Sequence, residues 1–253
     1  MPFTEVRVTR AGPIARLTLD RPQVLNALSP QLIDEALSAV REVAGSDARV
    51  LILNGAGASF SAGVDLKAAS SPDYTREVAR NHTGNARALC ELLDTMPQAT
   101  IAQVHGNCST GGLEVAIACD FILAADDAVF CDSHGKLGLR PGWGLSQRLP
   151  RRIGVMRAKE MSLTGRRVSG REAATLGLVL EALPPEALAA RVTELAETIA
   201  ANNPGSVAAY KALYRGAQAL GLDEGLAFEA AYRPPRRADA GPRRPLSDHL
   251  KTS

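Results

Sequence analysis

The sequence has few aromatic residues and almost no excess of charge. Phe, Trp and Tyr make up 4% of the 253 residues, and 29 Lys and Arg against 27 Asp and Glu leave a formal charge of +2. The core must therefore be built mainly from Ala, Val, Leu and Ile, and no overall field favours nucleic acid as a partner. No apolar run approaches the ~18 residues that a membrane span needs. The first ten residues lack the apolar segment of a secretory signal. These absences predict a soluble, cytoplasmic protein.

The sequence also lacks the usual motifs for metals and dinucleotides. No C-x-x-C pair is present, which argues against a zinc or redox site. No G-x-G-x-x-G follows a predicted strand, which argues against a Rossmann dinucleotide site. We therefore expect no metal and no separate cofactor. The cysteines are interpreted as reduced core residues: Cys90, Cys108, Cys119 and Cys131.

The pattern of apolar residues predicts a mixed α/β protein in which strand, strand and helix recur. Alternating residues in Glu5–Thr9 and Ile14–Leu19 predict a hairpin, and Ser29 followed by Pro30 predicts the start of a helix that ends near Val43. Further strands are predicted at Val50–Leu53, Ile101–Val104, Phe121–Ala124, Val129–Phe130 and Leu178–Glu181. Further helices are predicted at Pro72–Leu93, at Leu113–Ala118 and after the capping box Ser169-Gly-Arg-Glu172.

After Pro184-Pro185 the chain changes character. Helical patterns follow one another with no strand between them, at Glu186–Ala201, Pro204–Leu220 and Asp223–Tyr232. This predicts two units, a core over residues 1–195 and a helical oligomerisation module over residues 196–253. The module ends in a basic, proline-containing tail, which we expect to be irregular.

Two glycine-containing segments predict backbone donors for a ligand oxygen. Ala62-Gly63 lies in a loop of small residues after a predicted strand, and Gly111-Gly112 precedes an apolar helix. Two N–H groups, one from each segment, can bind a single developing oxyanion. Taken alone, Ala62-Gly63 is more typical of a tight turn, and Gly111-Gly112 is more typical of close helix packing.

Three segments together carry a family resemblance: SFSAGVDLK at residues 59–67, HGNCSTGGLE at residues 105–114 and LGLRPGWGLSQRL at residues 137–149. In this order and spacing they resemble the signature blocks of the enoyl-CoA hydratase/isomerase (crotonase-like) family, over roughly residues 3–230. The resemblance implies an α/β spiral of ββα turns with a C-terminal helical module. It also implies an acyl-CoA thioester as substrate, with CoA part of the substrate. Ala62 and Gly111 would donate to the thioester carbonyl, and Ala62, Gly63, Val64 and Asp65 would lie along the CoA.

Glu114 is the candidate acid/base group. It stands near the start of an otherwise apolar helix, where a lone carboxylate needs a partner or a task; favourable placement at a helix start is the alternative reading. Hydratases of the family have a glutamate here and a second one twenty residues later, where this chain has His134. Histidine transfers protons near neutral pH. We therefore predict an enoyl-CoA hydratase, a hydro-lyase, with Glu114 and His134 as catalytic residues. Asp132 is a nearby carboxylate able to take part.

Other functions remain open. Double-bond isomerisation runs on one acid/base residue such as Glu114, and dehydration or thioester hydrolysis uses the same oxyanion site. A different class of function is a non-catalytic protein that binds CoA or RNA. The RNA alternative depends on the basic tail alone. The Ala- and Leu-rich faces of the C-terminal helices are too large for this small module to bury alone, which predicts a homo-oligomer. The family resemblance implies a trimer or a dimer of trimers.

Overall fold

The computed structural model describes residues 3–233, and its chain begins with the predicted hairpin. Strand β1 (Val6–Ala11) pairs antiparallel with β2 (Ile14–Leu19). The turn between them contains Gly12 with a φ of +55°, a left-handed conformation that glycine adopts without steric cost. The prediction of a hairpin at this point is confirmed.

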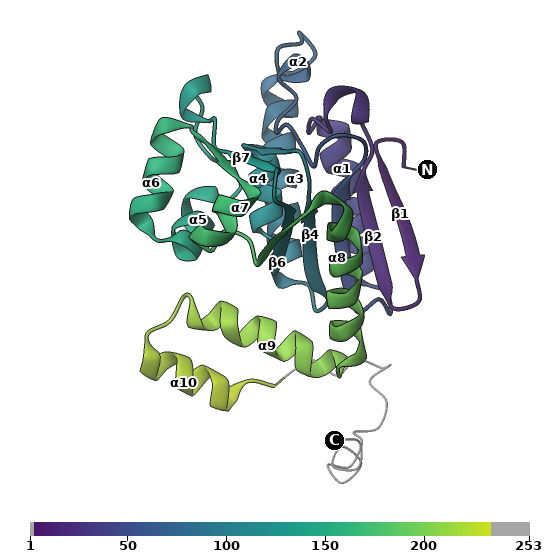
Figure 1. The fold of residues 1–253 in the computed structure, drawn as a ribbon, viewed down its shortest axis with the longest axis vertical. Helices are drawn as coiled ribbons and strands as arrows, with labels where there is room; N and C mark the ends of the chain where they lie inside the picture. Colours follow the sequence, from purple (N-terminus) through teal and green to yellow (C-terminus); the bar gives the residue numbers. More distant parts are fainter. Residues whose placement is uncertain (1–2, 234–253) are drawn as a thin grey trace.

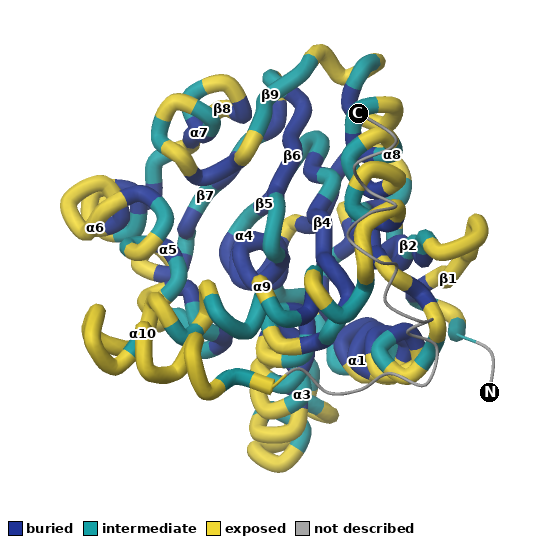
Figure 2. The backbone as a smooth tube through the Cα atoms, turned by 90° about the horizontal axis from the view of Figure 1, so that it is seen from below, coloured by how far each residue is buried: buried dark blue, intermediate teal, exposed yellow. Residues whose placement is uncertain are grey.

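The hairpin continues into a six-stranded sheet that forms the centre of the molecule. Its order is β1-β2-β3-β4-β6-β9, and every pairing after the hairpin is parallel. The added strands are β3 (Val50–Gly55), β4 (Ala99–Val104), β6 (Phe121–Ala125) and β9 (Glu181–Leu183). Parallel strands are covered on both faces and therefore read as continuous apolar runs. Figure 2 shows β4 and β6 as buried. The last strand begins at Glu181, where the sequence predicted that it would end.

A second, smaller sheet lies beside the first and defines the spiral. It consists of β5 (Asn107–Ser109), β7 (Val129–Cys131) and β8 (Arg167–Ser169), with Ser61 bridged in parallel to Cys108. The chain passes three times from the large sheet to the small one, from β3 to Ser61, from β4 to β5 and from β6 to β7. The fold is therefore the α/β spiral of ββα turns that the sequence predicted.

Helix α1 (Pro30–Ala44) forms where the capping signal predicted it. The Ser29 hydroxyl accepts a hydrogen bond from the Leu32 N–H at 3.0 Å, and seven apolar side chains of the helix are buried. It packs against α3 (Arg76–Thr95). The predicted start of that second helix at Pro72 is wrong, because Thr75 provides the cap and the preceding segment forms a separate short helix, α2 (Leu66–Ala69).

Between β7 and β9 the structure contains helices that the sequence did not predict. They are η2 (Gly135–Leu137), α5 (Leu145–Ile153) and α6 (Val155–Thr164), and the short η1 (Pro22–Val24) was also missed. The helices α4 (Gly111–Ile117) and α7 (Gly170–Leu176) were predicted, and Ser169 caps the second of them.

The C-terminal helices confirm the change in character after residue 184. They are α8 (Pro185–Ala201), α9 (Pro204–Ala217) and α10 (Leu222–Ala231). Helix α8 contacts β4, β6 and β3 of the large sheet. Helix α9 contacts β4 and packs on α10, and both helices lie to one side of the body (Figure 1). The predicted boundary at residues 195/196 falls inside α8, and the division into two units stays a prediction. The predicted irregular tail lies outside the described residues, apart from Arg233.

No helix between residues 3 and 233 is long and apolar enough to cross a membrane. The four cysteines carry no disulfide; Cys90, Cys108 and Cys119 are buried and Cys131 is partly exposed. Burial raises the pKa of the Cys119 thiol to about 12, which keeps it protonated at neutral pH.

Candidate active site

The three turns of the spiral deliver three segments to one place. Val64 follows Ser61 by three residues, Gly111 follows the end of β5 by two, and His134 follows the end of β7 by three. These small-sheet positions are parallel neighbours, since Ser61 bridges to Cys108 and β5 pairs with β7. Parallel strands end at the same edge, so the segments that leave them converge there.

A strained residue sets the start of α4. Thr110 has a φ of +51° and a ψ of −111°, a conformation that costs a β-branched residue about 1–3 kcal/mol. Its N–H donates to the Cys131 carbonyl at 2.8 Å, and its hydroxyl lies 2.6 Å from the Ser133 hydroxyl. Both contacts tie this residue to the segment that follows β7. Immediately after it, the Gly111 N–H makes no hydrogen bond within the described chain.

The second predicted donor requires a correction. The Ala62 N–H donates to the Leu25 carbonyl at 2.9 Å, so the prediction that it faces a ligand oxygen is wrong. The Gly63 N–H also has a partner, the Ser61 hydroxyl at 3.1 Å. By contrast, the Val64 N–H has no hydrogen-bond partner among residues 3–233. A Cβ placed on Gly63 would lie 3.4 Å from the Gly111 nitrogen, so the two loops adjoin. The two unpaired donors at this point are therefore Val64 and Gly111.

Asp65 holds this loop in place. Its carboxylate accepts hydrogen bonds from the Ala68 N–H at 3.0 Å, which caps α2, and from the Arg21 guanidinium at 2.8 Å. Burial alone would raise the pKa of this carboxyl, but those hydrogen bonds and the charge of Arg21 lower it. The backbone N–H of Asp65 donates to the Leu28 carbonyl, next to the parallel bridge between Leu28 and Val64. The side chain is already satisfied by the protein.

Glu114 is buried at the centre of the site, with 1% of its surface exposed. One carboxylate oxygen, Oε1, accepts the backbone N–H groups of Trp143 at 2.8 Å and Leu145 at 3.1 Å. Burial raises the pKa of the carboxyl, and the two N–H donors and His134 offset part of that rise. A carboxyl with a raised pKa exchanges protons nearer to neutral pH, as general acid–base catalysis requires.

His134 lies against the other oxygen of this carboxylate. Its Nε2 is 3.7 Å from Glu114 Oε2, and its Nδ1 is 2.7 Å from Asp132 Oδ1. Both partners are buried, like the ring itself. The structure thus brings Glu114 and His134, the two predicted catalytic residues, together. It also places Asp132, which the sequence analysis named only as a nearby carboxylate, in contact with His134.

One cavity of about 750 Å³ contains both groups. The Trp143 ring covers Gly111, because a Cβ on that glycine would lie only 2.6 Å from the ring. Beyond it the cavity wall is aromatic: the Tyr74 hydroxyl is 2.8 Å from His82 Nδ1, and the His82 ring stands 5.8 Å from Trp143. The cavity is lined by Val64, Leu66, Ala69, Tyr74, His82, Thr83, Arg87, Glu114, His134, Gly138, Leu139, Arg140, Gly142 and Trp143.

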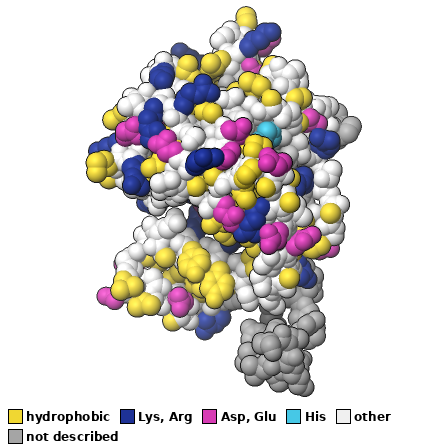
Figure 3. All heavy atoms as spheres, viewed as in Figure 1, with side chains coloured by type: hydrophobic (Ala, Val, Ile, Leu, Met, Phe, Trp, Pro, Cys, Tyr) yellow, Lys and Arg dark blue, Asp and Glu magenta, His cyan; other side chains and the backbone are white. Residues whose placement is uncertain are grey.

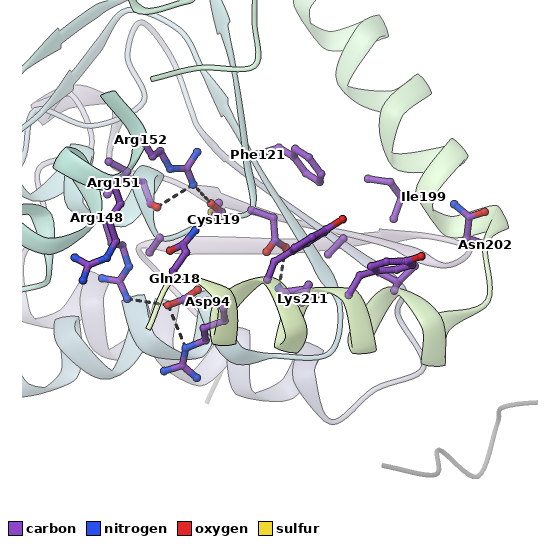
Figure 4. A pocket seen from close by; sticks show the side chains of 18 residues that line it. Asp94, Cys119, Phe121, Arg148, Arg151, Arg152, Ile199, Asn202, Lys211 and Gln218 are labelled. Carbon is purple, nitrogen blue, oxygen red and sulfur yellow. Dashed lines mark hydrogen bonds and ion pairs between the residues drawn. The ribbon is translucent and has the colours of Figure 1, made fainter. Parts of the chain in front are cut away.

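A second cavity, of about 430 Å³, lies between α9 and the body of the molecule (Figure 4). Its acidic side chains are paired with bases: Asp94 with Arg148 at 3.3 Å, and Asp120 with Lys211 at 2.8 Å. Neither acid is left to exchange a proton with a ligand, so this cavity is not the candidate active site. No three His, Cys, Asp or Glu side chains within residues 3–233 are arranged to hold a metal ion.

The spiral of ββα turns, with two unpaired backbone N–H groups and a buried glutamate at one edge of the small sheet, has the crotonase fold. Residues 9–233 match the family described as enoyl-CoA hydratase/isomerase. The chain belongs to this family, as its sequence motifs predicted.

The chain is similar to named relatives and to solved structures. The chain is 37% identical over 229 residues to a carnitinyl-CoA dehydratase of Salmonella arizonae, covering 88% of this chain and 85% of the relative. It is similar to the crystal structure of an enoyl-CoA hydratase from Bacillus anthracis, with a TM-score of 0.86, 36% identity and coverage of 90% and 88%. It is also similar to that of an enoyl-CoA hydratase from Polaromonas sp. JS666, with a TM-score of 0.84, 29% identity and coverage of 89% and 88%.

Proposed function

We propose that the protein is an enoyl-CoA hydratase, which adds water across the 2,3 double bond of an enoyl-CoA thioester. The observation that carries the proposal is the facing pair of Glu114 and His134, with 3.7 Å between Oε2 and Nε2. The pair shares its cavity with Val64, and Glu114 belongs to the helix that begins at Gly111. The N–H groups of Val64 and Gly111 have no partner within residues 3–233. Two proton-transferring groups and two oxyanion donors are the parts that hydration needs.

The thioester carbonyl oxygen accepts hydrogen bonds from the Val64 and Gly111 N–H groups in this proposal. When water attacks C3, the electrons of the double bond move toward C2 and that oxygen, which becomes an enolate. Donors fixed in advance stabilise this charge more than they stabilise the neutral carbonyl, and that difference lowers the barrier. The CoA part is expected along Ala62, Gly63, Val64 and Asp65, and the acyl part against the aromatic wall of the cavity.

The protons balance within the pair. One of the two groups accepts a proton from the attacking water, and the other delivers a proton to C2 as the enolate collapses. The pair holds one proton before the reaction and one proton after it, on the opposite partner. The reaction consumes only the thioester and water, so the proposal includes no redox cofactor and no metal.

The names of the relatives support water chemistry over double-bond isomerisation. A hydratase and a dehydratase catalyse the same step in opposite directions. The test is a screen of 2-enoyl-CoA substrates of increasing chain length, with detection of product mass. A gain of one water supports the proposal. An isomer of unchanged mass would make the protein an isomerase that uses Glu114 alone, and bound but unchanged acyl-CoA would make it a binding protein.

We further propose that the chain works as a homo-oligomer, a trimer or a dimer of trimers, in the cytoplasm. Helices α9 and α10 expose large apolar side chains: Tyr210, Tyr214, Leu222 and Leu226 are 56–79% exposed. The two tyrosine rings stack at 5.8 Å, and Figure 3 shows hydrophobic side chains gathered over this part of the molecule. An exposed apolar patch of this kind marks an association surface, and a further copy of the chain is the proposed occupant.

A further inference from the structure

We propose that Asp132 is a positioning residue that keeps the shared proton of the site on His134. Glu114 then acts as the base toward water, and His134 acts as the acid toward C2. This inference rests on the proposed hydratase function, because it assigns the two proton transfers of that reaction to particular groups. It concerns a residue that does not itself touch the substrate.

The geometry fixes the orientation of the imidazole ring. Asp132 Oδ1 lies 2.7 Å from His134 Nδ1, and the same oxygen accepts the backbone N–H of His134 at 3.1 Å. Short contacts of this kind between a carboxylate and a ring N–H are among the strong hydrogen bonds of proteins. With Nδ1 committed to Asp132, the second nitrogen, Nε2, is the one directed at Glu114. The ring therefore presents a single nitrogen to the reacting atoms.

Asp132 is suited to remain ionised. Burial alone would raise the pKa of its carboxyl, but hydrogen bonds from His134 and from the Ser162 hydroxyl outweigh burial and lower it. A carboxylate that stays ionised cannot serve as the proton carrier of the site. It can, however, stabilise a positive charge on the ring beside it.

The charges around the ring favour the protonated imidazole. Within the described chain, the titratable groups in contact with the ring are two carboxylates, Asp132 and Glu114. A positive ring between two buried carboxylates gains attraction from both, and the low local dielectric strengthens it. The Trp143 and Leu145 N–H groups stabilise the ionised form of Glu114 from the other side. The shared proton therefore belongs on His134 in the resting enzyme.

The reaction sequence follows from this assignment. Glu114 Oε2 removes a proton from water while the water oxygen bonds to C3 and the enolate forms. The Nε2–H of His134 then protonates C2, and the thioester carbonyl is restored. Glu114 is now protonated and His134 neutral. The proton passes from Oε2 to Nε2, and the pair returns to its starting state.

The variant that tests this inference is Asp132→Asn. An asparagine amide can donate to Nδ1, which places the ring proton on Nε2 and leaves a neutral imidazole. We expect kcat to fall by on the order of 10²–10⁴-fold, with KM changed less than about threefold. The matched control is Asp126→Asn, which removes the partner of the exposed Arg171 and should leave kcat unchanged.

Nitrogen-15 NMR of labelled histidine provides a readout that does not depend on turnover, with the His134 signals assigned from a His134→Gln sample. At neutral pH we expect both ring nitrogens of His134 to be protonated in the wild type and in Asp126→Asn, and only one in Asp132→Asn. A neutral wild-type ring, protonated on either nitrogen alone, would overturn the inference, as would an Asp132→Asn protein that matches its control in spectrum and kcat. If the expected spectra appear in a protein that hydrates no enoyl-CoA, the hydratase proposal fails while the placement of the proton stands.

Discussion

Burial of the Glu114 carboxylate lowers the stability of the fold, and hydrogen bonds offset this cost on one of its two oxygens. It is surrounded by the apolar side chains of α4, and an unpaired buried carboxylate would destabilise the fold by several kcal/mol. The structure offsets this cost on one oxygen only, through the Trp143 and Leu145 N–H groups. The other oxygen is left to face His134 and the cavity. The arrangement stabilises the carboxylate while keeping one oxygen available for proton transfer.

The substitution Glu114→Gln tests this role. Glutamine keeps the shape and one carbonyl oxygen for the two N–H groups, but it cannot exchange a proton. We expect kcat to fall by on the order of 10²–10⁴-fold while acyl-CoA binding, measured by calorimetry, stays within a few-fold of wild type. The control is Glu197→Gln on the exposed side of α8, which should behave as wild type. Loss of binding along with turnover would show that Glu114 shapes the site instead.

The oxyanion donors are tested at Val64, because its N–H makes no hydrogen bond within residues 3–233 that a proline would break. Val64→Pro removes the donor, whereas Val64→Ala shortens the side chain and keeps it. We expect a loss in kcat of on the order of 10²–10³-fold for the proline variant relative to the alanine variant. Both folds are checked by circular dichroism. Equal activities in two folded variants would remove Val64 from the oxyanion site.

At the residue scale, spacing in the sequence located the contact between Glu114 and His134 but not the two unpaired N–H groups. Glu114 and His134 stand where the family motif places its two acid/base groups, and the structure brings them together. Ala62 was chosen wrongly as a donor because successive N–H groups in a loop look alike in sequence. Only the fold shows that the Ala62 N–H donates to the Leu25 carbonyl and that the Val64 N–H has no partner within residues 3–233.

At the scale of elements, α1 is joined to the first strand through Glu35. Its carboxylate accepts the backbone N–H groups of Thr4 at 2.8 Å and Glu5 at 2.7 Å, together with the Gln31 side chain at 3.0 Å. Burial alone would raise the pKa of Glu35, but these hydrogen bonds lower it to about 2. A carboxyl whose pKa is depressed on folding stabilises the fold above its unfolded pKa, which is 4.5. That stabilisation is lost as the pH falls from there toward 2.

Glu35→Gln should therefore lower the free energy of unfolding by about 1–2 kcal/mol at pH 7, because the donors lose a charged acceptor. The difference from wild type should shrink below pH 4.5 and vanish near pH 2. Urea unfolding at a series of pH values measures both effects, with the exposed Glu42→Gln on the same helix as control. A difference that stays constant with pH would show that the ionised carboxylate does not contribute.

Local signals explain which elements were predictable. Helix α1 has a capping serine, a proline at its first position and one apolar face, and it lies where these signals placed it. Helix α5 begins after Gly144 in a left-handed conformation and contains Pro150. Its sequence therefore resembles a loop, and packing of Leu145, Leu149 and Ile153 into the core overrides that preference.

At the scale of the molecule, the spiral explains how residues far apart in sequence form one site. Each turn adds a segment at the same edge of the small sheet, so Val64, Gly111 and His134 meet although up to 70 positions separate them. Motif order implied this architecture through the family resemblance. Assembly is different, because the exposed apolar surface of α9 and α10 is the basis of the proposed oligomer but does not indicate how many copies associate.

Assembly is tested by placing a charge on this surface. Leu222 is 79% exposed on α10, and Leu222→Asp should shift the protein toward a 26.7 kDa monomer, because it buries a charge in the proposed interface. Leu163→Asp on α6, at 82% exposure, is the matched control and should keep the wild-type mass. Sedimentation at micromolar concentration measures each. A wild-type protein that is already monomeric would contradict the proposed oligomer.

The most direct test of the account is to follow the water that the enzyme is proposed to add. The protein is incubated with a short 2-enoyl-CoA in ¹⁸O-labelled water, and the product is analysed by mass spectrometry. We expect a 3-hydroxyacyl-CoA that carries the label on the oxygen bound to C3, formed by the wild type and nearly lost in Glu114→Gln. A product that has moved its double bond without gaining labelled water would contradict it, as would equal label incorporation by the variant.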